Sequence, residues 1–561
     1  MLSSLSCLLG VLAVAVNAAP QVKIGQTTIV GKAFPAFDLD FFGGIPFAEP
    51  PLGELRFKPP VLKTQLDVKT LDASSFGQGC LQLGGTATTF TEDCLTVNIF
   101  RPSGIDSNAK LPVVRVKVLL FNADFDYGGG FHDGEASIYN ASAIVAQSIV
   151  RGTPIVYVNF NYRLGPLGFP QGQEAQNKGA LNLGLKDQLT ALEWVQANIE
   201  KFGGDKSKVT VFGESAGAIM TAILFLNSPI QKLARAAIFE SGSAATTPVF
   251  QASHRQLDWE LFVKGVPACS ALASTNNAFE CLRRVNSTEI FSGFVSALSN
   301  PPDPFGFSPT LDGPGGLIPD LPSRLLAQGR FAHLPFIAGT NLDEGTMFVP
   351  TTNLSTPELA EDLIETYTPS QPGPGTLQAT VNKLLALYPD DPALGSPFNT
   401  GNQTFGLPSN YKRAAAIQGD VAFQSQRRNW IRTATRAGVK TFGYLFTQPQ
   451  PTGNPALGVF HSSEVFFVYG APPDTSASAR QLSSIMIDYW VSFATSLNPN
   501  DGHGNPRPQW EQYTTKNEVL LQLNAANLTT IPDDYRKEQI DFILSDPAVF
   551  HERRSLGRWS R

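Results

Sequence analysis

The chain has 561 residues and a formal net charge of −6, with 42% hydrophobic and 16% charged residues. This composition excludes a disordered chain, and the net negative charge argues against a nucleic-acid partner. The length exceeds that of an average domain, although large α/β enzymes reach it as one unit.

The first 18 residues, MLSSLSCLLGVLAVAVNA, carry no charged side chain and end in small residues. Such a short apolar stretch is typical of a secretory signal peptide, with cleavage after Ala18 or Ala19. It is too short to span a membrane, no later stretch is apolar enough, and the charged end HERRSLGRWSR excludes a membrane tail or lipid anchor. We therefore predict a secreted protein with one domain over residues 19–561, in which about 545–561 form a loose charged tail.

Secretion places the cysteines in an oxidising compartment, where an even number favours disulfides. Cys7 lies in the signal peptide, and three pairings are open to the other four cysteines. The tight spacings favour two local pairs, Cys80–Cys94 and Cys269–Cys281. Five N-x-S/T sequences are candidates for glycosylation, as expected of a secreted protein: Asn140, Asn286, Asn353, Asn402 and Asn527.

Strand-like and helix-like segments alternate along much of the first half of the chain. Residues 96–100 and 154–160 are predicted strands, and 187–202 is a predicted helix with one apolar face and a Gly-Gly stop. Later strands are expected at 236–239, 335–339 and 440–446. Proline and glycine crowd residues 300–322 and 369–375, which we expect to be loops. The alternation predicts an α/β fold with a large, mostly parallel sheet covered by helices.

The segment VTVFGESAGAIM, residues 209–220, places Ser215 between Gly213 and Gly217. A strand-like run precedes it and a helix-like run follows it, which is the context of a G-x-S-x-G nucleophile elbow. The alternative is a strand–helix turn that happens to contain serine. In an elbow, the helix directs its first N–H groups at the reacting oxygen, so the N–H of Ala216 is an expected oxyanion donor.

A serine nucleophile needs a histidine base, which follows the acid in the chain order of this motif. That order disfavours three of the six histidines, His132, His254 and His333. His503 lies in the flexible sequence NPNDGHGNP, and His551 lies in the charged tail. A mobile segment positions a base poorly, so we choose His461, in the short polar turn of GVFHSSEVFF.

The acid should lie between Ser215 and His461. Glu344 follows a strand in FIAGTNLDEGTMF, where functional groups of α/β sheets gather, and its neighbour Asp343 is the rival. Spacing alone leaves both open. Upstream, Gly128-Gly129-Gly130 follow an apolar run, and such glycines let backbone N–H groups approach a ligand.

These segments resemble the type-B carboxylesterase and lipase family, which also contains cholinesterases and fungal secreted lipases. The resemblance runs from about residue 24 to beyond 490 and includes GIPFAEPPLGELRFKPP, EDCLTVNIFRP, YGGGF, VNFNYRLGPLGF, NLGLKDQLTALEWVQANIEKFGGD, FESGS and the segments quoted above. It implies an α/β-hydrolase fold with one catalytic unit, the same local disulfide pairs, and neither metal nor cofactor. It favours Glu344 over Asp343, and it implies a triad and an oxyanion hole at Ser215, Glu344, His461, Gly129, Gly130 and Ala216.

One stretch departs from the family pattern. The family runs from L-P-V through a short apolar strand into the glycine loop, whereas here RVKVLLFNADFD intervenes after Val114. Buried parallel strands are nearly all apolar, and unpaired charges such as that of Arg115 are costly to bury. We expect either an insertion over residues 115–126 or an imperfect sequence there, with the oxyanion geometry affected.

The resemblance implies a serine hydrolase that cleaves carboxylic esters through an acyl-enzyme. The alternative is a non-catalytic adhesion or binding protein on the same fold, which the presence of both Ser215 and His461 disfavours. The 13 residues between Cys80 and Cys94, LQLGGTATTFTED, contain no Trp for a choline cation and no helical stripe for a lid. Choline esters are not expected, whereas acylglycerols and steryl, feruloyl or small aryl esters remain open.

Overall fold

The structure is a computed structural model that describes residues 18–83, 90–117, 129–226, 229–299, 306–352, 354–366 and 374–550. Within these residues an 11-stranded sheet has the order β14-β13-β12-β11-β10-β9-β7-β8-β6-β4-β3. From β8 to β13 all neighbours in this order are parallel, so the sheet is mostly parallel, as predicted. A small separate sheet has the order β1-β2-β5. The strands are β1 (Gln21–Ile24), β2 (Thr27–Val30), β3 (Lys32–Phe34), β4 (Leu39–Pro46), β5 (Thr70–Asp72), β6 (Thr96–Pro102), β7 (Leu111–Lys117), β8 (Val156–Phe160), β9 (Gly204–Glu214), β10 (Ala236–Glu240), β11 (Phe336–Asn341), β12 (Thr441–Phe446), β13 (Val519–Leu523) and β14 (Thr529–Pro532).

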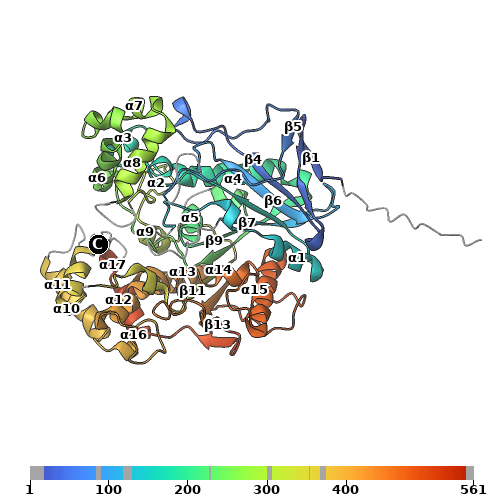
Figure 1. Ribbon diagram of the computed structural model, residues 1–561. Helices are drawn as coiled ribbons and strands as arrows, with labels where there is room; N and C mark the ends of the chain where they lie inside the picture. The colour runs from blue at the N-terminus through green and yellow to red at the C-terminus, as the bar shows by residue number, and fades with distance from the viewer. Residues whose placement is uncertain are drawn as a thin grey trace, which may run out of the picture.

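Helices cover both faces of the sheet (Figure 1). Side chains of a strand alternate between faces, and β10 shows this: Ala236 and Ile238 join one core, whereas Ala237 and Phe239 join the other. The first core is covered by α1 (Ser142–Val150) and α15 (Ala477–Ser496), and the second by α4 (Leu183–Asn198), α5 (Ala216–Leu224) and α13 (Ser425–Arg436). A strand that is buried on both sides has no room for a polar face, which explains why β10, AAIFE, is apolar up to its last residue.

The remaining helices lie outside these layers or connect them. A third core joins α10, α11, α12, α16 and α17, which lie near one another in Figure 1. Phe550 of α17 is buried in this core, so the packed chain continues to residue 550, and the rest of the expected tail lies outside the described residues. These helices are α2 (Gly165–Gly168), α3 (Gly172–Asn177), α6 (Gln256–Lys264), α7 (Phe279–Arg284), α8 (Ser287–Ser299), α9 (Pro322–Ala327), α10 (Thr356–Thr366), α11 (Pro374–Leu387), α12 (Ser409–Gly419), α14 (Val465–Val468), α16 (Lys537–Ser545) and α17 (Pro547–Phe550).

The elements expected from the sequence are present with shifted ends. The predicted strands correspond to β6, β8, β10, β11 and β12, each within two residues at either end. The predicted helix begins four residues earlier, at Leu183, and its last four residues form a 3₁₀ turn that Gly203 ends with a positive φ of 85°. Within the described ranges, no helix is both long and apolar enough to cross a bilayer.

The cysteines form the two local pairs that their spacing favours. Cys80 and Cys94 are bonded with a Cα–Cα distance of 5.0 Å, and Cys269 and Cys281 with one of 5.8 Å, both ordinary for a disulfide. Four of the glycosylation candidates are exposed, and the fifth, Asn353, lies outside the described residues: the exposed four are Asn140, Asn286, Asn402 and Asn527.

The positive charge of Arg115, in the strand before the glycine loop, is buried and has partners. Arg115 of β7 is 2% exposed, and its guanidinium donates a hydrogen bond to the carbonyl of Gln188 at 3.0 Å. The same group lies 3.9 Å from the ring centre of Phe160, an attraction that is stronger when desolvated. Burial lowers the pKa of Arg115 well below its ordinary value. Of the expected insertion over 115–126, residues from 118 onward lie outside the described residues.

Candidate active site

Ser215 occupies a sharp turn between β9 and α5. Its backbone has φ 50° and ψ −128°, a region that non-glycine residues rarely adopt and that marks a functional constraint. The turn brings Gly213 and Gly217 so close that a Cβ at Gly213 would lie 2.6 Å from the carbonyl carbon of Gly217. The first glycine of G-x-S-x-G, Gly213, is therefore required by space, as an elbow demands.

His461 joins Ser215 to Glu344. Its Nε2 is 2.8 Å from Oγ of Ser215, and its Nδ1 is 2.6 Å from a carboxylate oxygen of Glu344. The histidine and the glutamate are both buried, and the rings of Phe348 and Phe423 contact the imidazole at centroid distances of 5.1 and 4.8 Å. The three polar groups thus form a continuous chain of hydrogen bonds that runs from the half-buried Ser215 to the fully buried His461 and Glu344.

The structure separates the two acidic candidates at the end of β11. Glu344 uses one oxygen for His461, and its other oxygen accepts the N–H of Asn341 at 2.7 Å. Asp343 is turned away and binds loop groups: it accepts the hydroxyl of Ser396 and the N–H groups of Phe398 and Val459, each at 2.8 Å. Glu344 is therefore the carboxylate placed to orient the imidazole.

The other histidines lie elsewhere. Nε2 of His132 is hydrogen-bonded to the carbonyl of Gly306, and burial lowers the pKa of His132 to about 4, which keeps it neutral. His254 stacks on Phe250, His333 contacts Phe331, and His503 is exposed, whereas His551 lies outside the described residues. Within the described chain, Ser215 is hydrogen-bonded to one histidine, His461.

The structure describes the expected oxyanion donors, Gly129, Gly130 and Ala216, but only part of the glycine loop. Ala216 is the first residue of α5, so its N–H has no acceptor within the helix. The carbonyl of Gly129 accepts the N–H groups of His132 at 2.6 Å and Asp133 at 3.1 Å, which closes a tight turn around Gly130. Gly128 lies outside the described residues. The oxyanion role of Gly129, Gly130 and Ala216 stays a prediction.

Three further glutamates, to which the sequence patterns assigned no role, are fully buried beside the triad: Glu214, Glu240 and Glu464. Burial raises the pKa of each: the charge of Glu464 adds to this effect at Glu214 and Glu240, and the charge of Glu344 adds to it at Glu464, whose pKa reaches about 8. Glu214 is the last residue of β9 and Glu240 the last residue of β10, positions where the sequence alone does not separate a buried carboxyl group from a solvated one in the loop that follows.

Neutral hydrogen-bond donors surround these carboxyl groups. Glu214 accepts the hydroxyl of Ser462 and lies 3.4 Å from Nε2 of His461. Glu240 accepts Nε1–H of Trp490 at 2.6 Å. Glu464 accepts the hydroxyl of Ser241 at 3.3 Å and the side-chain amide of Asn341. Within the described residues, no group of three or more histidine, cysteine or acidic side chains is arranged to hold a metal ion.

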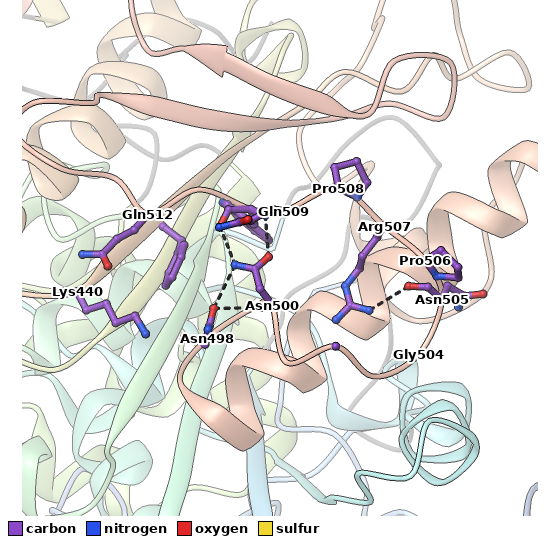
Figure 2. Close-up of a pocket in the computed structure, with 13 residues that line it drawn as sticks. Lys440, Asn498, Asn500, Gly504, Asn505, Pro506, Arg507, Pro508, Gln509 and Gln512 are labelled. Carbon is purple, nitrogen blue, oxygen red and sulfur yellow. Dashed lines mark hydrogen bonds between the residues drawn. The ribbon is translucent and has the colours of Figure 1, made fainter.

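A hollow of about 670 Å³ lies at the amino-terminal end of β12, away from the strand ends that carry Ser215 and Glu344 (Figure 2). It is lined by Lys440, just before β12, and by the loop that follows α15. Asn500 uses its amide within this loop, where it donates to Asn498 at 3.1 Å and to the carbonyl of Trp510 at 2.8 Å. Ligands of open α/β sheets bind at the carboxyl ends of strands, where Ser215 and Glu344 lie, so this hollow is not part of the candidate site.

Comparison with known proteins places the chain in a family. The sequence model of the Carboxylesterase family matches residues 18–543. Secreted lipase 1 of Botryotinia fuckeliana is 35% identical over 578 residues, covering 95% of this chain and 94% of that protein. Lipase 2 of Geotrichum candidum is 33% identical over 555 residues, covering 91% and 93%. Secreted triacylglycerol lipase LIP1 of Gibberella zeae is 31% identical over 566 residues, covering 94% and 90%.

Solved structures agree with this assignment. EstA of Aspergillus niger matches with a TM-score of 0.80 at 25% identity, covering 95% of this chain and 99% of that one. A PNB esterase matches with a TM-score of 0.73 at 25% identity, covering 93% and 100%. These similarities favour catalysis and give no support to a non-catalytic adhesion protein. The chain belongs to the carboxylesterase family, has the α/β-hydrolase fold and is a hydrolase of carboxylic esters.

Proposed function

We propose that this protein is a secreted serine esterase whose catalytic triad is Ser215, His461 and Glu344. The observation that carries the proposal is the hydrogen-bond chain from the Ser215 hydroxyl through the imidazole to the Glu344 carboxylate, with distances of 2.8 and 2.6 Å. A serine hydroxyl is a weak nucleophile unless a base at this distance removes its proton. The elbow adds to this by exposing Oγ at the carboxyl edge of the sheet.

The reaction follows from these positions. Oγ of Ser215 attacks the ester carbonyl carbon while Nε2 of His461 takes its proton, and the carboxylate of Glu344 stabilises the imidazolium that forms. The imidazolium then donates that proton to the departing alkoxide, leaving an acyl-enzyme. Water attacks the acyl-enzyme with His461 again as base, and the acid product leaves Ser215 restored.

Negative charge develops on the carbonyl oxygen in each half of the reaction. The N–H of Ala216 lies at the positive end of α5, and the N–H groups of Gly129 and Gly130 are proposed to complete the oxyanion hole. Donors of this kind are each worth roughly 10²–10³-fold in kcat. Removal of water by the buried surroundings of the triad strengthens these interactions.

We infer that residues 19–561 form one catalytic unit that is exported after loss of residues 1–18, which lie almost wholly outside the described residues. The secreted relatives support export, and relatives named as lipases support esters of fatty acids as the substrate class. The Cys80–Cys94 loop lacks a Trp, which disfavours choline esters.

The test is covalent labelling of the secreted protein with a fluorophosphonate, followed by peptide mass spectrometry. We expect the label on Ser215 in the wild type and none in Ser215→Ala. Label on another serine, or no label with retained hydrolysis, contradicts the proposed triad. A series of p-nitrophenyl esters of rising chain length, with methyl ferulate beside it, then separates fatty-acyl from aryl specificity, and N-terminal sequencing locates the cleavage site.

A further inference from the structure

A π-helical turn, Asp420–Gln424, joins α12 to α13 and is buried throughout. Such a turn inserts one extra residue into a helix and is frequently found at functional sites. This helix lies directly against the turn that carries Glu344, because a Cβ at Gly345 would lie 2.0 Å from the carbonyl oxygen of Ala415. The π turn, which continues α12, therefore lies beside the turn that carries Glu344.

The side chain of Gln424 is fully buried and hydrogen-bonded on both sides. Its Nε2 donates to the carbonyl of Asn341 at 2.6 Å. Its Oε1 accepts the hydroxyls of Thr340 at 2.6 Å and Tyr535 at 2.5 Å. A carbonyl only accepts, so the amide nitrogen must face Asn341 and the orientation of the amide is determined. Gln424 thereby holds two consecutive residues of β11.

Asn341 passes this constraint to two members of the triad. The peptide between Thr340 and Asn341 carries the N–H that binds Glu344 at 2.7 Å, and Gln424 holds both residues of that peptide. The side-chain amide of Asn341 donates to the carbonyl of Phe460 at 2.8 Å, one residue before His461. The acid and the histidine loop are thus both attached to Asn341.

The residue before Gln424 reaches the histidine itself. The ring of Phe423 lies 4.8 Å from the imidazole of His461 and stacks on Phe348 at 5.5 Å. Two consecutive residues of the π turn therefore contact the imidazole and the strand end that holds its acid.

We propose that Gln424 is a positioning residue for the catalytic acid: it fixes the peptide of Asn341 and through it the Glu344–His461 hydrogen bond. The proposal rests on the proposed triad. Gln424 touches no reacting atom, so its loss should reduce turnover without changing substrate binding. A looser carboxylate also stabilises the imidazolium less, which lowers the pKa of the histidine in catalysis. The acidic limb of kcat/KM, which reports that pKa, should move to lower pH.

The experiment compares Gln424→Met with Gln426→Met. Gln426 is also buried and hydrogen-bonded, to the carbonyl of Val421 at 3.1 Å and the hydroxyl of Ser425 at 3.3 Å, away from the triad. For Gln424→Met we expect a loss of about 10- to 100-fold in kcat with KM within about twofold, and an acidic limb lower by about 0.5 to 1 pH unit. Gln426→Met should keep the wild-type limb and most of its kcat.

Thr340→Val serves as the second variant, because it removes one hydroxyl from the amide of Gln424 and keeps the shape of the strand. Thr340→Val should also move the acidic limb of kcat/KM to lower pH, by less than Gln424→Met does. If Gln424→Met does not fold, Thr340→Val alone tests the proposal. The proposal is overturned if the acidic limb of kcat/KM stays at the wild-type pH in Thr340→Val and also in Gln424→Met, where that variant folds. It is overturned as well if Gln426→Met shifts this limb as much as Gln424→Met does. Fluorophosphonate labelling of wild-type Ser215 is scored separately, so failure of the triad itself is distinguished from failure of this inference.

Discussion

The carboxylate of Asp343 accepts the N–H of Val459 at 2.8 Å, two residues before His461. The residue beside the proposed acid therefore connects the acid turn to the histidine loop without contacting the imidazole. This contact explains how two adjacent carboxylates, which are equivalent in the sequence pattern, have different tasks. In the proposed triad Glu344 orients the base, whereas Asp343 binds the backbone of the loop that carries the base.

We expect Glu344→Gln to reduce kcat about 10⁴-fold, because an amide does not hold the imidazole in the required tautomer. Asp343→Asn should cost far less activity and about 1–3 kcal/mol of unfolding free energy, since it places an N–H₂ group opposite backbone donors in a buried site. Steady-state kinetics and chemical denaturation of both variants check this. Equal losses of kcat, or the reverse order, would reassign the acid to Asp343.

Ser215→Ala should abolish hydrolysis while the fold remains. Loss of the nucleophile in a triad costs on the order of a millionfold in kcat, and alanine removes little more than the hydroxyl at this turn. The measurement is hydrolysis of p-nitrophenyl butyrate, with circular dichroism and thermal unfolding as controls for folding. A folded variant with a tenth of the wild-type activity contradicts the assignment.

The buried carboxyl group of Glu464 makes stability depend on pH. Burial and the neighbouring carboxylate of Glu344 raise its pKa from 4.5 to about 8 in the folded protein. Between these values the folded protein holds a proton that the unfolded chain has lost, so the free energy of unfolding falls as pH rises. This contribution is fully present below pH 4.5 and lost above pH 8.

Replacing this group should therefore flatten the pH profile. In Glu464→Gln we expect Tm to fall less between pH 5 and pH 8 than it does in the wild type. Glu193→Gln, at an exposed position of α4, is the matched control and should follow the wild-type profile. If Glu464→Gln keeps the wild-type slope, Glu464 does not hold a proton in this range.

The loop between Cys80 and Cys94 should not act as a lid. It has 13 residues and is closed by a disulfide, and among its described residues Leu81 is buried while Leu83 and Phe90 pack against the core. Residues 84–89 lie outside the described residues. A loop pinned in this way does not easily form a two-turn helix that swings over the site.

Hydrolysis of tributyrin should accordingly rise with concentration in a saturable manner through its solubility limit. The measurement is the initial rate below and above that limit, with a fully soluble ester as reference. A sharp increase at the limit, absent for the soluble ester, would mean that another segment covers the entrance.

Motifs with local geometry were predictable from the sequence. The elbow of Ser215 depends on two neighbouring glycines, and the chain order and the short polar turn pointed to His461, the histidine that the structure places beside Ser215. Gln424 was not predictable, because its role depends on a helix reaching a strand end more than 80 residues away in the chain. Similarly, nothing beside Arg115 in the sequence reveals that Phe160 and Gln188 compensate its burial. Charges at strand ends, such as Glu240, are indistinguishable in sequence from solvated loop charges.

The triad is assembled across great distances along the chain. Ser215 and His461 are 246 residues apart and Glu344 and His461 are 117 apart, and the strands that carry Ser215 and Glu344 are separated by β10. Contacts of such long range form late, because the intervening loops must be closed first. Esterase activity consequently requires the completed sheet. During refolding it should return after helical structure and compactness have formed, and fragments of the chain should be inactive.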